Sequence, residues 1–459
     1  MSKKEKKEKE KGIGIVRFWA WNFRGMSVAV QVVLIGYITF YCTDVLGLNA
    51  ALVATLLMAT KLFDGVTDVF AGYLVDITKT KWGKARPYEF SIIGLWLATW
   101  AMFSVPVELQ TVAKCAWVVI CYTLAQSVFC TLLNANGTAY MVRAFNKQEH
   151  YVKLSSLGGL CTVAGVAVFN VTFPSMMAQA GTDAGAWSSM VMKIAIPLAI
   201  IGMMRFLFVP EKYEVDAKGE SINLKEVKIL LTNNKYIYII ALVGLASNLV
   251  GALGVSVYYF TYIVGDVSLM GIMSFFTIVA MLTMVFYPVV LKRMSIKCFC
   301  QLGCFIYMVG GIVLFFAGSD VMLLGVGNII LGIGTLPVSM ISGLMIVECA
   351  DFNEWEGRPR MEGTLGSVNG LAVKIGSALG TLVSGVLLSA SGYVGGAEVL
   401  PDSALLMIRL LYSLIPAALY MLVAVILNFY KLDKQIDQIR KENEERRAAA
   451  AGNATTVEG

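Results

Sequence analysis

One cation and two carboxylates lie inside an apolar stretch that is long enough to form a membrane-spanning helix. They are Lys61, Asp64 and Asp68, separated by apolar, small or hydroxyl residues. Because residues three or four apart share one face of a helix, we expect the three charged side chains to lie together. A charge near the centre of a bilayer costs about 2.5–3.5 kcal/mol on insertion scales. These residues are therefore the first candidates for a functional site, in which they are paired, hydrated or bound to a ligand.

Two carboxylates one helical turn apart can bind a hard metal cation or a proton. Cations such as Na⁺ prefer oxygen ligands, which Asp64 and Asp68 supply. Closely spaced carboxylates also repel each other, and a proton bound by one of them relieves that repulsion. The pattern leaves Na⁺ and H⁺ both open. It also leaves open a fixed ionic latch, in which the two acids are permanently paired with bases.

The composition places the whole chain in a membrane. Of its 459 residues, 57% are hydrophobic and 15% are charged, and the mean hydropathy is +0.71. Soluble globular proteins carry about 25% charged residues. An enzyme is not expected, because the single histidine, His150, lies in a loop and no nucleophile–base pair is recognisable. The nine cysteines lie within or beside apolar runs, which favours small buried thiols over a structural metal site or disulfides.

Apolar runs of about 20 residues, the length that crosses a bilayer, recur twelve times. The longest polar interruption is Glu211 to Lys235, which separates six runs from six. We place the runs at 16–43, 50–76, 88–106, 113–142, 152–178, 187–209, 237–264, 268–290, 298–317, 321–347, 364–391 and 404–430.

Basic residues follow every second span, and this bias sets the orientation. Lys and Arg concentrate in cytoplasmic loops, so both termini are expected in the cytoplasm of a cell that holds the protein in its cell (inner) membrane. The mixed-charge N-terminal tail has no cleavage-site pattern and is not a signal peptide. Nucleic-acid binding is not expected, since topology accounts for the basic residues. These residues are Lys79, Lys81, Lys84, Arg86, Arg143, Lys147, Lys212, Lys218, Lys225, Lys228, Lys235, Lys292, Arg293, Lys297, Arg358 and Arg360.

Two groups of six spans predict an all-α membrane protein with the major facilitator fold. In such transporters the substrate path lies between the two halves near the membrane midplane. For the C-terminal tail we expect a solvated helix, with Leu432, Ile436 and Ile439 on one stripe. The expected parts are a cytoplasmic tail at 1–15, an N-terminal half at 16–210, a cytoplasmic linker at 211–236, a C-terminal half at 237–430 and a cytoplasmic tail at 431–459.

Further polar residues interrupt the predicted spans and should face a central cavity. Lys374 lies well inside the eleventh span, and its expected counter-charge is the pair Asp64 and Asp68. The candidate substrate-binding residues are Asn22, Arg24, Asn134, Asn136, Asn248 and Asn369.

Charged clusters at the cytoplasmic ends of two spans are candidate gates. The stretch from Gly72 to Pro87 contains the first cluster, and the loop after the tenth span contains the second. A salt-bridged gate would hold one conformation closed. The candidate gate residues are Asp76, Lys84, Arg86, Glu348, Asp351 and Arg358.

Four stretches in this order resemble the glycoside–pentoside–hexuronide:cation symporter family, the branch of the major facilitator superfamily that includes melibiose permease. Together they touch most of the chain. They are Tyr41 to Leu48; Lys61 to Asp68 with Asp76 and Trp82 to Pro87; Ala246 to Asn248 with Tyr258 to Asp266; and Glu348 to Trp355 with Glu362, Gly363 and Val373 to Ser377.

The resemblance implies secondary active transport coupled to Na⁺, H⁺ or Li⁺ by alternating access. It assigns cation coordination to Asp64 and Asp68, and it makes Lys374 the positive group that links cation site to substrate site. Lys61 stands where the family usually has arginine. The lysine keeps the positive charge but lacks the planar guanidinium group, which can donate two parallel hydrogen bonds. The family's span-four hydroxyl that helps to hold Na⁺ falls near Cys130.

The sugar-binding positions of the family depart from the pattern. Val28 occupies the position of the family's sugar-binding aspartate in span one. Leu133 or Asn134 occupies the position of the family's acid or amide in span four, and Gly158 lies near the position where span five is expected to carry an arginine. We therefore expect a sugar, glycoside or related derivative that is not bound in the melibiose manner. The alternatives are an amphipathic, lysolipid-like solute and a non-transporting receptor or scaffold. Expected partners are the small-molecule substrate, the coupling cation and the lipid bilayer, with no cofactor and a monomeric state.

Overall fold

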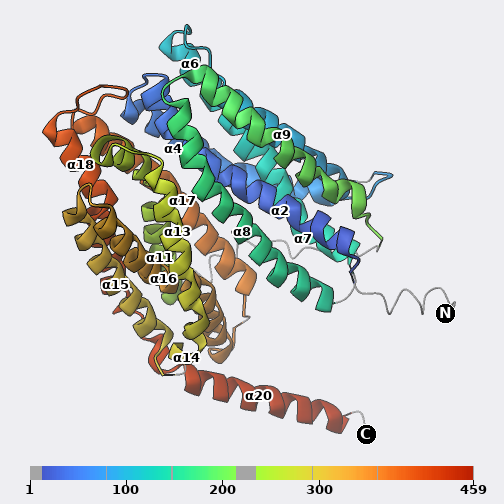
Figure 1. The fold of residues 1–459 in the computed structure, drawn as a ribbon. Coiled ribbons are helices and arrows are strands. Elements are labelled where there is room, and N and C mark those ends of the chain that lie inside the picture. The colour runs from blue at the N-terminus through green and yellow to red at the C-terminus, as the bar shows by residue number, and fades with distance from the viewer. Residues whose placement is uncertain are drawn as a thin grey trace. The chain divides into compact units, whose positions relative to one another are not determined.

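The computed structural model of the chain describes residues 13–78, 80–145, 148–212, 234–291, 293–358 and 360–457, and these residues are almost entirely helical (Figure 1). In this part, nine helical stretches are long and apolar enough to cross a membrane. The other three predicted spans fall on α4 (Ala50–Ile77), α5 (Ser91–Met102) and α13 (Leu269–Met281). The nine are Ile15–Val45, Thr111–Gly137, Leu157–Ala180, Ala184–Phe208, Tyr236–Val264, Ile296–Ala317, Val321–Trp355, Thr364–Ala390 and Asp402–Leu427.

Several of the basic residues used to predict the topology lie outside the residues that the structure describes. The basic residues Lys79, Lys147, Lys218, Lys225, Lys228 and Lys292 lie outside the described residues, as do most of the N-terminal tail and of the central linker.

The chain divides into two compact units by its internal contacts. The first contains Met1–Lys218, Ser256–Ser274 and Leu382–Leu405, and the second contains Gly219–Val255, Phe275–Thr381 and Leu406–Gly459. These units follow contacts rather than chain order, so the domain boundaries expected at residues 210 and 237 stay a prediction.

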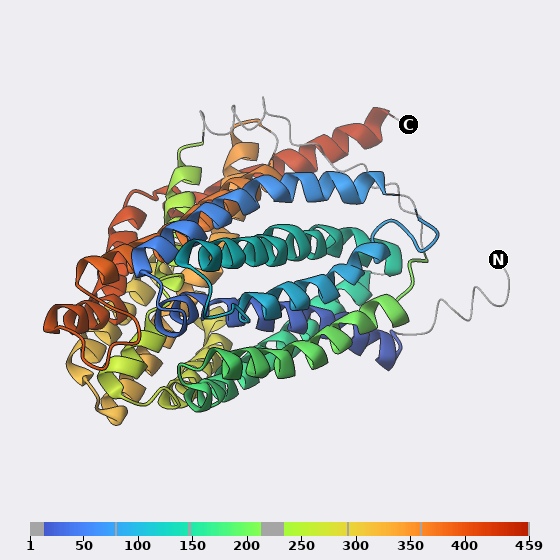
Figure 2. The ribbon, with the colours of Figure 1, turned by 90° about the horizontal axis from the view of Figure 1, so that it is seen from above.

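Close packing of glycines against polar and apolar side chains organises the first unit. In it α2 packs against both α8 and α9, and the helices run side by side (Figures 1 and 2). A Cβ at Gly158 would lie 2.1 Å from the side-chain oxygen of Asn22, and one at Gly165 would lie 2.3 Å from Cγ of Met26. Small residues that allow such approach are typical of membrane helix packing. The helices are α2 (Ile15–Ile35), α4, α5, α6 (Thr111–Thr123), α7 (Thr131–Ala144), α8 (Gln148–Ala180) and α9 (Ala184–Phe208).

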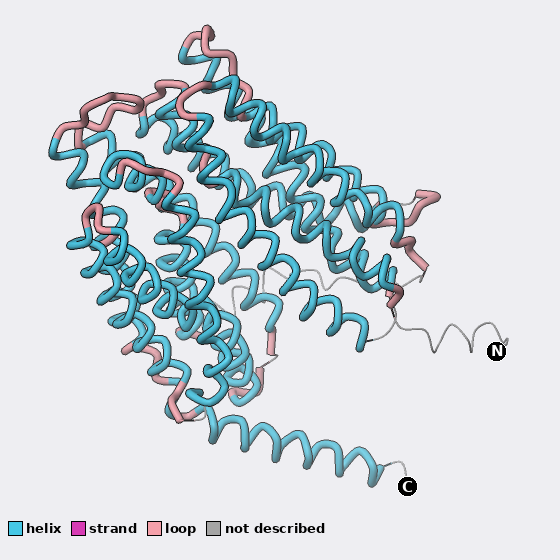
Figure 3. Tube along the Cα trace, in the orientation of Figure 1, coloured by secondary structure: helices cyan, strands magenta, loops and turns pink. Residues whose placement is uncertain are grey.

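The second unit has its core between α15, α16, α11 and α19. A Cβ at Gly303 would lie 2.9 Å from the carbonyl oxygen of Gly334, which brings the backbones of α15 and α16 close together. The rings of Tyr307 and Tyr420 stack with centroids 3.9 Å apart. Loops and turns join the helices at their ends (Figure 3). The main helices are α11 (Tyr236–Gly251), α15 (Ile296–Ala317), α16 (Val321–Trp355), α19 (Leu414–Leu427), α20 (Ile436–Val457) and the part of α17 (Glu362–Ala390) that precedes Leu382.

The C-terminal tail forms the predicted helix, but the helix is not solvated on all sides. Leu432, Ile436 and Ile439 are buried, and α20 packs against α16. The apolar stripe of the tail therefore packs inside the second unit, to which the tail itself belongs.

A buried carboxylate, Asp44, ties together three parts of the first unit that lie far apart in the sequence. Its carboxylate accepts hydrogen bonds from Tyr393 Oη (2.6 Å), from Tyr262 Oη and from Thr43 Oγ1 (2.6 Å). The backbone N–H of Gly396 is 3.4 Å away. Burial, with the neighbouring Tyr258 and Asp44, raises the pKa of Tyr393, so its phenol stays protonated and donates. Asp44 is only 6% exposed, and hydroxyl and N–H donors satisfy it in place of a counter-ion.

Replacement of Asp44 by asparagine should destabilise the protein, because an amide N–H₂ would take the place of one carboxylate oxygen and face one of the two phenol donors. A buried donor left without an acceptor costs about 1–3 kcal/mol. Thermal unfolding of the detergent-solubilised protein measures this as a lower Tm. The matched control is Asp266→Asn, since Asp266 is exposed and, in the part of the chain that the structure describes, accepts hydrogen bonds from the nearby Ser268. An unchanged Tm for Asp44→Asn would contradict the role of Asp44 as a structural acceptor.

Candidate functional site

A hydroxyl from a neighbouring helix contacts the first of the two predicted cation ligands. Asp64 lies on α4 and is half-buried, as is Lys61. Ser127 lies in the π-helical turn Leu124–Cys130 that continues α6, is 2% exposed, and donates a hydrogen bond to Asp64 Oδ1. Thr67 Oγ1 also donates, 3.1 Å from the Asp64 carbonyl oxygen. Oxygen atoms of two helices therefore gather around Asp64.

The other members of the predicted cation and coupling site are placed less fully. Asp68 is on α4, one turn after Asp64, but its side chain lies outside the described part of the structure. Lys374 is half-buried on α17 in the second unit. Its expected pairing with Asp64 and Asp68 of the first unit stays a prediction.

A pocket of about 340 Å³ in the first unit brings together three of the predicted substrate-binding residues, Asn22, Arg24 and Asn134. Asn22 donates to the carbonyl oxygen of Phe18 at 2.9 Å, and Asn134 Nδ2 lies 3.5 Å from Cys130 Sγ. The full lining is Trp21, Asn22, Arg24, Gly25, Asn134, Gly137, Met141, Leu154, Gly158, Gly159, Thr162 and Arg205.

The remaining three predicted substrate residues do not line this pocket. Asn136 is fully buried and donates to the carbonyl oxygen of Ala85 at 3.1 Å. Asn248 and Asn369 lie in the second unit, where Asn248 donates to Gly244 at 2.9 Å and Asn369 Oδ1 packs over the same glycine. Their part in substrate binding stays a prediction.

Behind the pocket lies a buried ionic triad. Glu89 is completely buried, and its carboxylate lies 3.3 Å from Arg24 Nε and 3.5 Å from Arg205 Nη1. Arg24 also donates to the carbonyl oxygen of Leu133. The Arg205 guanidinium lies 3.2 Å from the centroid of Trp21. Two guanidinium groups therefore share one carboxylate.

Glu89 and Arg205 were not among the site residues predicted from the sequence. Both stand at the ends of predicted spans, 88–106 and 187–209, where a charged side chain is normally taken to reach the interface. The available signal was weak: one acid closely follows the basic loop that ends at Pro87. Ser127 was missed because a serine in an apolar helix commonly bonds to its own backbone.

The first candidate gate is held by a carboxylate at the start of the predicted linker, Glu211. The backbone N–H groups of Lys84, Ala85 and Arg86 donate to the Glu211 carboxylate at 3.1, 2.8 and 2.6 Å. Gly83 has a φ of +116°, and a Cβ there would lie 2.4 Å from Glu211 Cδ. Three successive N–H groups form a concave anion site. The interaction of the Glu211 carboxylate with these N–H groups fixes the loop that carries the predicted gate residues Lys84 and Arg86.

Arg86 uses its side chain to secure the same loop. Its Nε and Nη2 donate to the carbonyl oxygen of Phe206 at 2.9 and 2.7 Å. The guanidinium of Arg86 is therefore engaged within the first unit. Asp76 ends the same stretch of α4, but its side chain lies outside the described residues.

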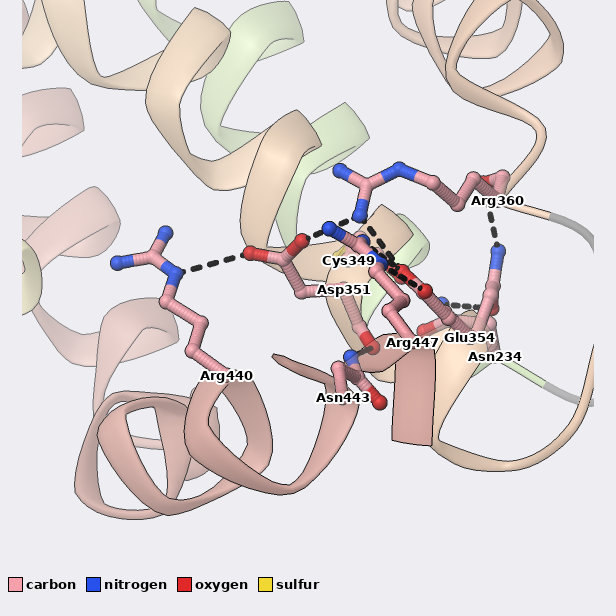
Figure 4. A network of polar contacts seen from close by, with 9 residues as sticks. Asn234, Cys349, Asp351, Glu354, Arg360, Arg440, Asn443 and Arg447 are labelled. Atoms are coloured by element: carbon pink, nitrogen blue, oxygen red, sulfur yellow. Dashed lines mark hydrogen bonds and ion pairs between the residues drawn. The ribbon is translucent and has the colours of Figure 1, made fainter. Parts of the chain in front are cut away.

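The second candidate gate is a charged network in the second unit (Figure 4). Asp351 is bound from different sides by Arg360 Nη1 at 2.8 Å and by Arg440 Nε of α20 at 2.9 Å. Glu354 pairs with Arg360 at 2.8 Å and with Arg447 of α20. The network therefore fastens the C-terminal helix to the end of α16 and to the residues that follow.

The two other predicted gate residues of this unit have different partners. Glu348 is buried and accepts a hydrogen bond from Tyr430 Oη at 2.7 Å. Burial and the nearby Glu348 raise the pKa of Tyr430, which keeps its hydroxyl as the donor. Arg358 pairs with Glu356 at 2.8 Å, near the surface.

Comparison with known proteins assigns the chain to a family. The family model described as MFS/sugar transport protein matches residues 26–434. The chain belongs to this family. Its members are transporters of the major facilitator superfamily and not enzymes, so the resemblance proposed from the four sequence stretches is confirmed.

Individual relatives and structures agree with this assignment. The isoprimeverose transporter of Lactiplantibacillus pentosus is 29% identical over 87% of this chain and 84% of that protein. An Escherichia coli K12 protein with the provisional name glycoside/cation symporter is 24% identical over 90% and 91%. A crystal structure of a D-xylose–proton symporter has a TM-score of 0.63 at 14% identity, covering 90% of this chain and 96% of that one.

The family and the fold settle the coarse function. The predicted all-α membrane protein with the major facilitator fold is confirmed by the family and by the structural likeness, which concerns the fold alone. The chain is a multi-pass membrane transporter of the MFS/sugar transport family.

Replacement of Glu211 by alanine should loosen the loop at Lys84 to Arg86, because three N–H donors lose a charged acceptor. Hydrogen bonds to a charged group contribute about 1.5–3 kcal/mol. We expect a lower Tm in detergent and faster amide hydrogen exchange at these three residues. Glu398→Ala is the matched control, since Glu398 is an exposed acid of the same unit. Exchange rates in Glu211→Ala equal to those of the wild type would contradict the role of the Glu211 carboxylate in holding this loop.

Proposed function

We propose that this protein imports a sugar, a glycoside or a related sugar derivative together with Na⁺ or H⁺, by alternating access. The observation that carries the proposal is the carboxylate of Asp64 in an apolar helix, in contact with a hydroxyl from a neighbouring helix. The names of the relatives, an isoprimeverose transporter and a glycoside/cation symporter, support a sugar as the transported solute.

In this proposal Asp64 and Asp68 coordinate the coupling cation, and Ser127 adds a neutral oxygen. A set of two carboxylates and a hydroxyl suits a hard cation such as Na⁺, and either carboxylate can instead take a proton. Lys61 and Lys374 are coupling residues that compete with the cation for the carboxylates. Release of Lys374 from the acids on cation binding would link the cation site to the substrate site.

In this proposal, polar side chains of the predicted spans bind the substrate. Asn22, Arg24 and Asn134 supply hydrogen bonds from the pocket of the first unit, and Asn248 and Asn369 supply them from the second unit. Asn136 supports the site by holding the backbone at Ala85. The polar lining of the pocket favours a sugar over a lysolipid-like solute, because each sugar hydroxyl needs a partner when it leaves water.

Two charged clusters form a gate on the cytoplasmic side that holds one state of the transport cycle closed. The first uses Asp76, Lys84 and Arg86, and the second uses Glu348, Asp351 and Arg358. Lys and Arg in every second loop place both termini and both clusters in the cytoplasm. The protein acts as a monomer in the cell (inner) membrane.

Replacement of Asp64 by asparagine should abolish coupling, because the cation loses a charged ligand while the pocket is left intact. In proteoliposomes, with isoprimeverose and simple glycosides as probes, we expect uptake driven by a Na⁺ or H⁺ gradient to fall about tenfold or more. Exchange of labelled for unlabelled sugar without a gradient should persist.

The control for this experiment is Asp266→Asn, which removes an exposed acid of the same unit. It should leave gradient-driven uptake at the wild-type level. Undiminished cation-dependent uptake by Asp64→Asn would contradict the assignment of Asp64 to the cation site.

A further inference from the structure

We propose that Asp44, Tyr262, Tyr393 and Gly396 form a gate, the Asp44 gate, that closes the transport path on the side opposite the cytoplasmic loops. This inference rests on the proposed function, because a gate requires alternating access. It gives these residues a part in the transport cycle beyond their part in stability. The observation behind it is that their hydrogen bonds join the two predicted six-span halves of the chain at the ends of the spans.

The first unit contains two segments of the predicted C-terminal half. Ser256–Ser274 covers the end of the seventh predicted span and the start of the eighth, and Leu382–Leu405 covers the end of the eleventh and the start of the twelfth. In the predicted topology these span ends lie on one face of the membrane, opposite the basic loops. Parts of both halves are therefore packed into one unit at this face.

Asp44 bonds both of these segments to the end of the first predicted span. Its carboxylate accepts a hydrogen bond from Tyr262 Oη of one segment and from Tyr393 Oη of the other, the latter at 2.6 Å. The two segments are also bonded to each other, because the N–H of Gly396 donates to Tyr262 Oη at 3.1 Å. One carboxylate therefore joins three parts of the chain that come from both halves.

Glycines bring the two halves close together at three further points of the same face. At each point a Cβ in place of a glycine hydrogen would overlap an atom of the predicted N-terminal half. Small residues allow such close approach of backbones, and their surfaces can separate and meet again without interlocking side chains. The pairs are Gly395 with the carbonyl oxygen of Thr43, Gly385 of α17 with Ala54 of α4, and Gly271 of α13 with the carbonyl oxygen of Val171 of α8.

Two residues of the Asp44 gate lie in π-helical turns. Asp44 is in the turn Tyr41–Val45, and Tyr262 is in the turn Phe260–Val264. Such turns are rare and are frequent at functional sites. Return of either turn to α-helical hydrogen bonding would rotate its side chains about the helix axis. Each turn therefore gives the gate a local way to release the carboxylate.

The chemistry of the gate suits a contact that forms and breaks in each cycle. Asp44 is 6% exposed, and its partners within the described residues are hydroxyl and N–H donors. Closing removes the carboxylate from water, and these donors offset the cost of doing so. Opening returns the carboxylate to water. Because the two solvations compensate each other, the open and closed states can have similar free energies.

The competing explanation is that the cluster around Asp44 is a permanent tie. Weakening a permanent tie loosens the structure around it and protects no other region. Weakening a gate increases the population of the state that is open at this face, and alternating access then closes the opposite face. Protection of the cytoplasmic face therefore distinguishes a gate from a permanent tie.

The test is amide hydrogen exchange in Tyr393→Phe, which removes one donor to Asp44 and keeps the ring that packs against Tyr258. We expect exchange at 258–264 and 391–397 to rise about tenfold or more. Exchange at the cytoplasmic segments 82–87 and 353–358 should fall about twofold or more. Tyr262→Phe removes the other phenol donor and should give the same pattern.

Tyr151→Phe is the control variant. It removes a hydroxyl of the same unit that donates to the carbonyl oxygen of Phe145 at 2.7 Å, on the cytoplasmic side of the predicted topology. Exchange at 391–397 should stay at the wild-type rate. In the two gate variants, unchanged exchange at 391–397, or faster exchange there without slower exchange at 82–87 and 353–358, would overturn the gate.

Uptake into proteoliposomes separates this inference from the proposed function. Cation-driven uptake of glycosides by the wild type, with no protection of the cytoplasmic segments in Tyr393→Phe, would overturn the gate and leave the symport of sugars standing. Opposite changes of exchange at the two faces, in a protein that takes up no glycoside under a Na⁺ or an H⁺ gradient, would overturn the symport of sugars and leave the gate standing. Absence of both results would overturn both proposals.

Discussion

The cost of burying charge away from water governs the organisation of this protein. The chain meets that cost in three ways. Asp44 is surrounded by hydroxyl and N–H donors, so its charge is solvated by dipoles that the fold supplies. Glu211 is held by three successive backbone N–H groups. Asp351 is paired with arginines of two different segments. Each of these groups is satisfied within the protein, which suits a structural role.

Formal charge alone does not separate structural clusters from candidate binding sites. Asp44 and Glu211 each keep a charge of −1 among hydrogen-bond donors, and Asp351 and Glu354 with their three arginines sum to +1. The group of the candidate cation site, Lys61, Asp64 and Asp68, sums to −1 on one helix. A cation that binds there supplies an electrostatic partner of the opposite sign.

The range of an interaction along the chain explains how far the sequence could predict this structure. Hydropathy and length predicted the spans, and the spacing of Asp64 and Asp68 predicted a candidate cation site, because both are local properties. The partners of Asp44 and of Glu89 were not predicted, since Tyr393 lies 349 residues from Asp44 and Arg205 lies in another helix from Glu89. A single sequence carries no record of such distances. Glu211 was assigned to a solvated linker because an acid in a polar stretch gives no local sign of the loop that encloses it.

On the proposed function, a bound cation changes the charge of the site on α4. Lys61, Asp64 and Asp68 sum to −1, and one bound cation brings this sum to zero. A net charge is expensive to enclose in a low-dielectric membrane interior, so cation binding lowers the cost of closing the protein around these three groups. Part of the coupling then follows from the charge of the site itself, before any contact between cation and substrate is considered.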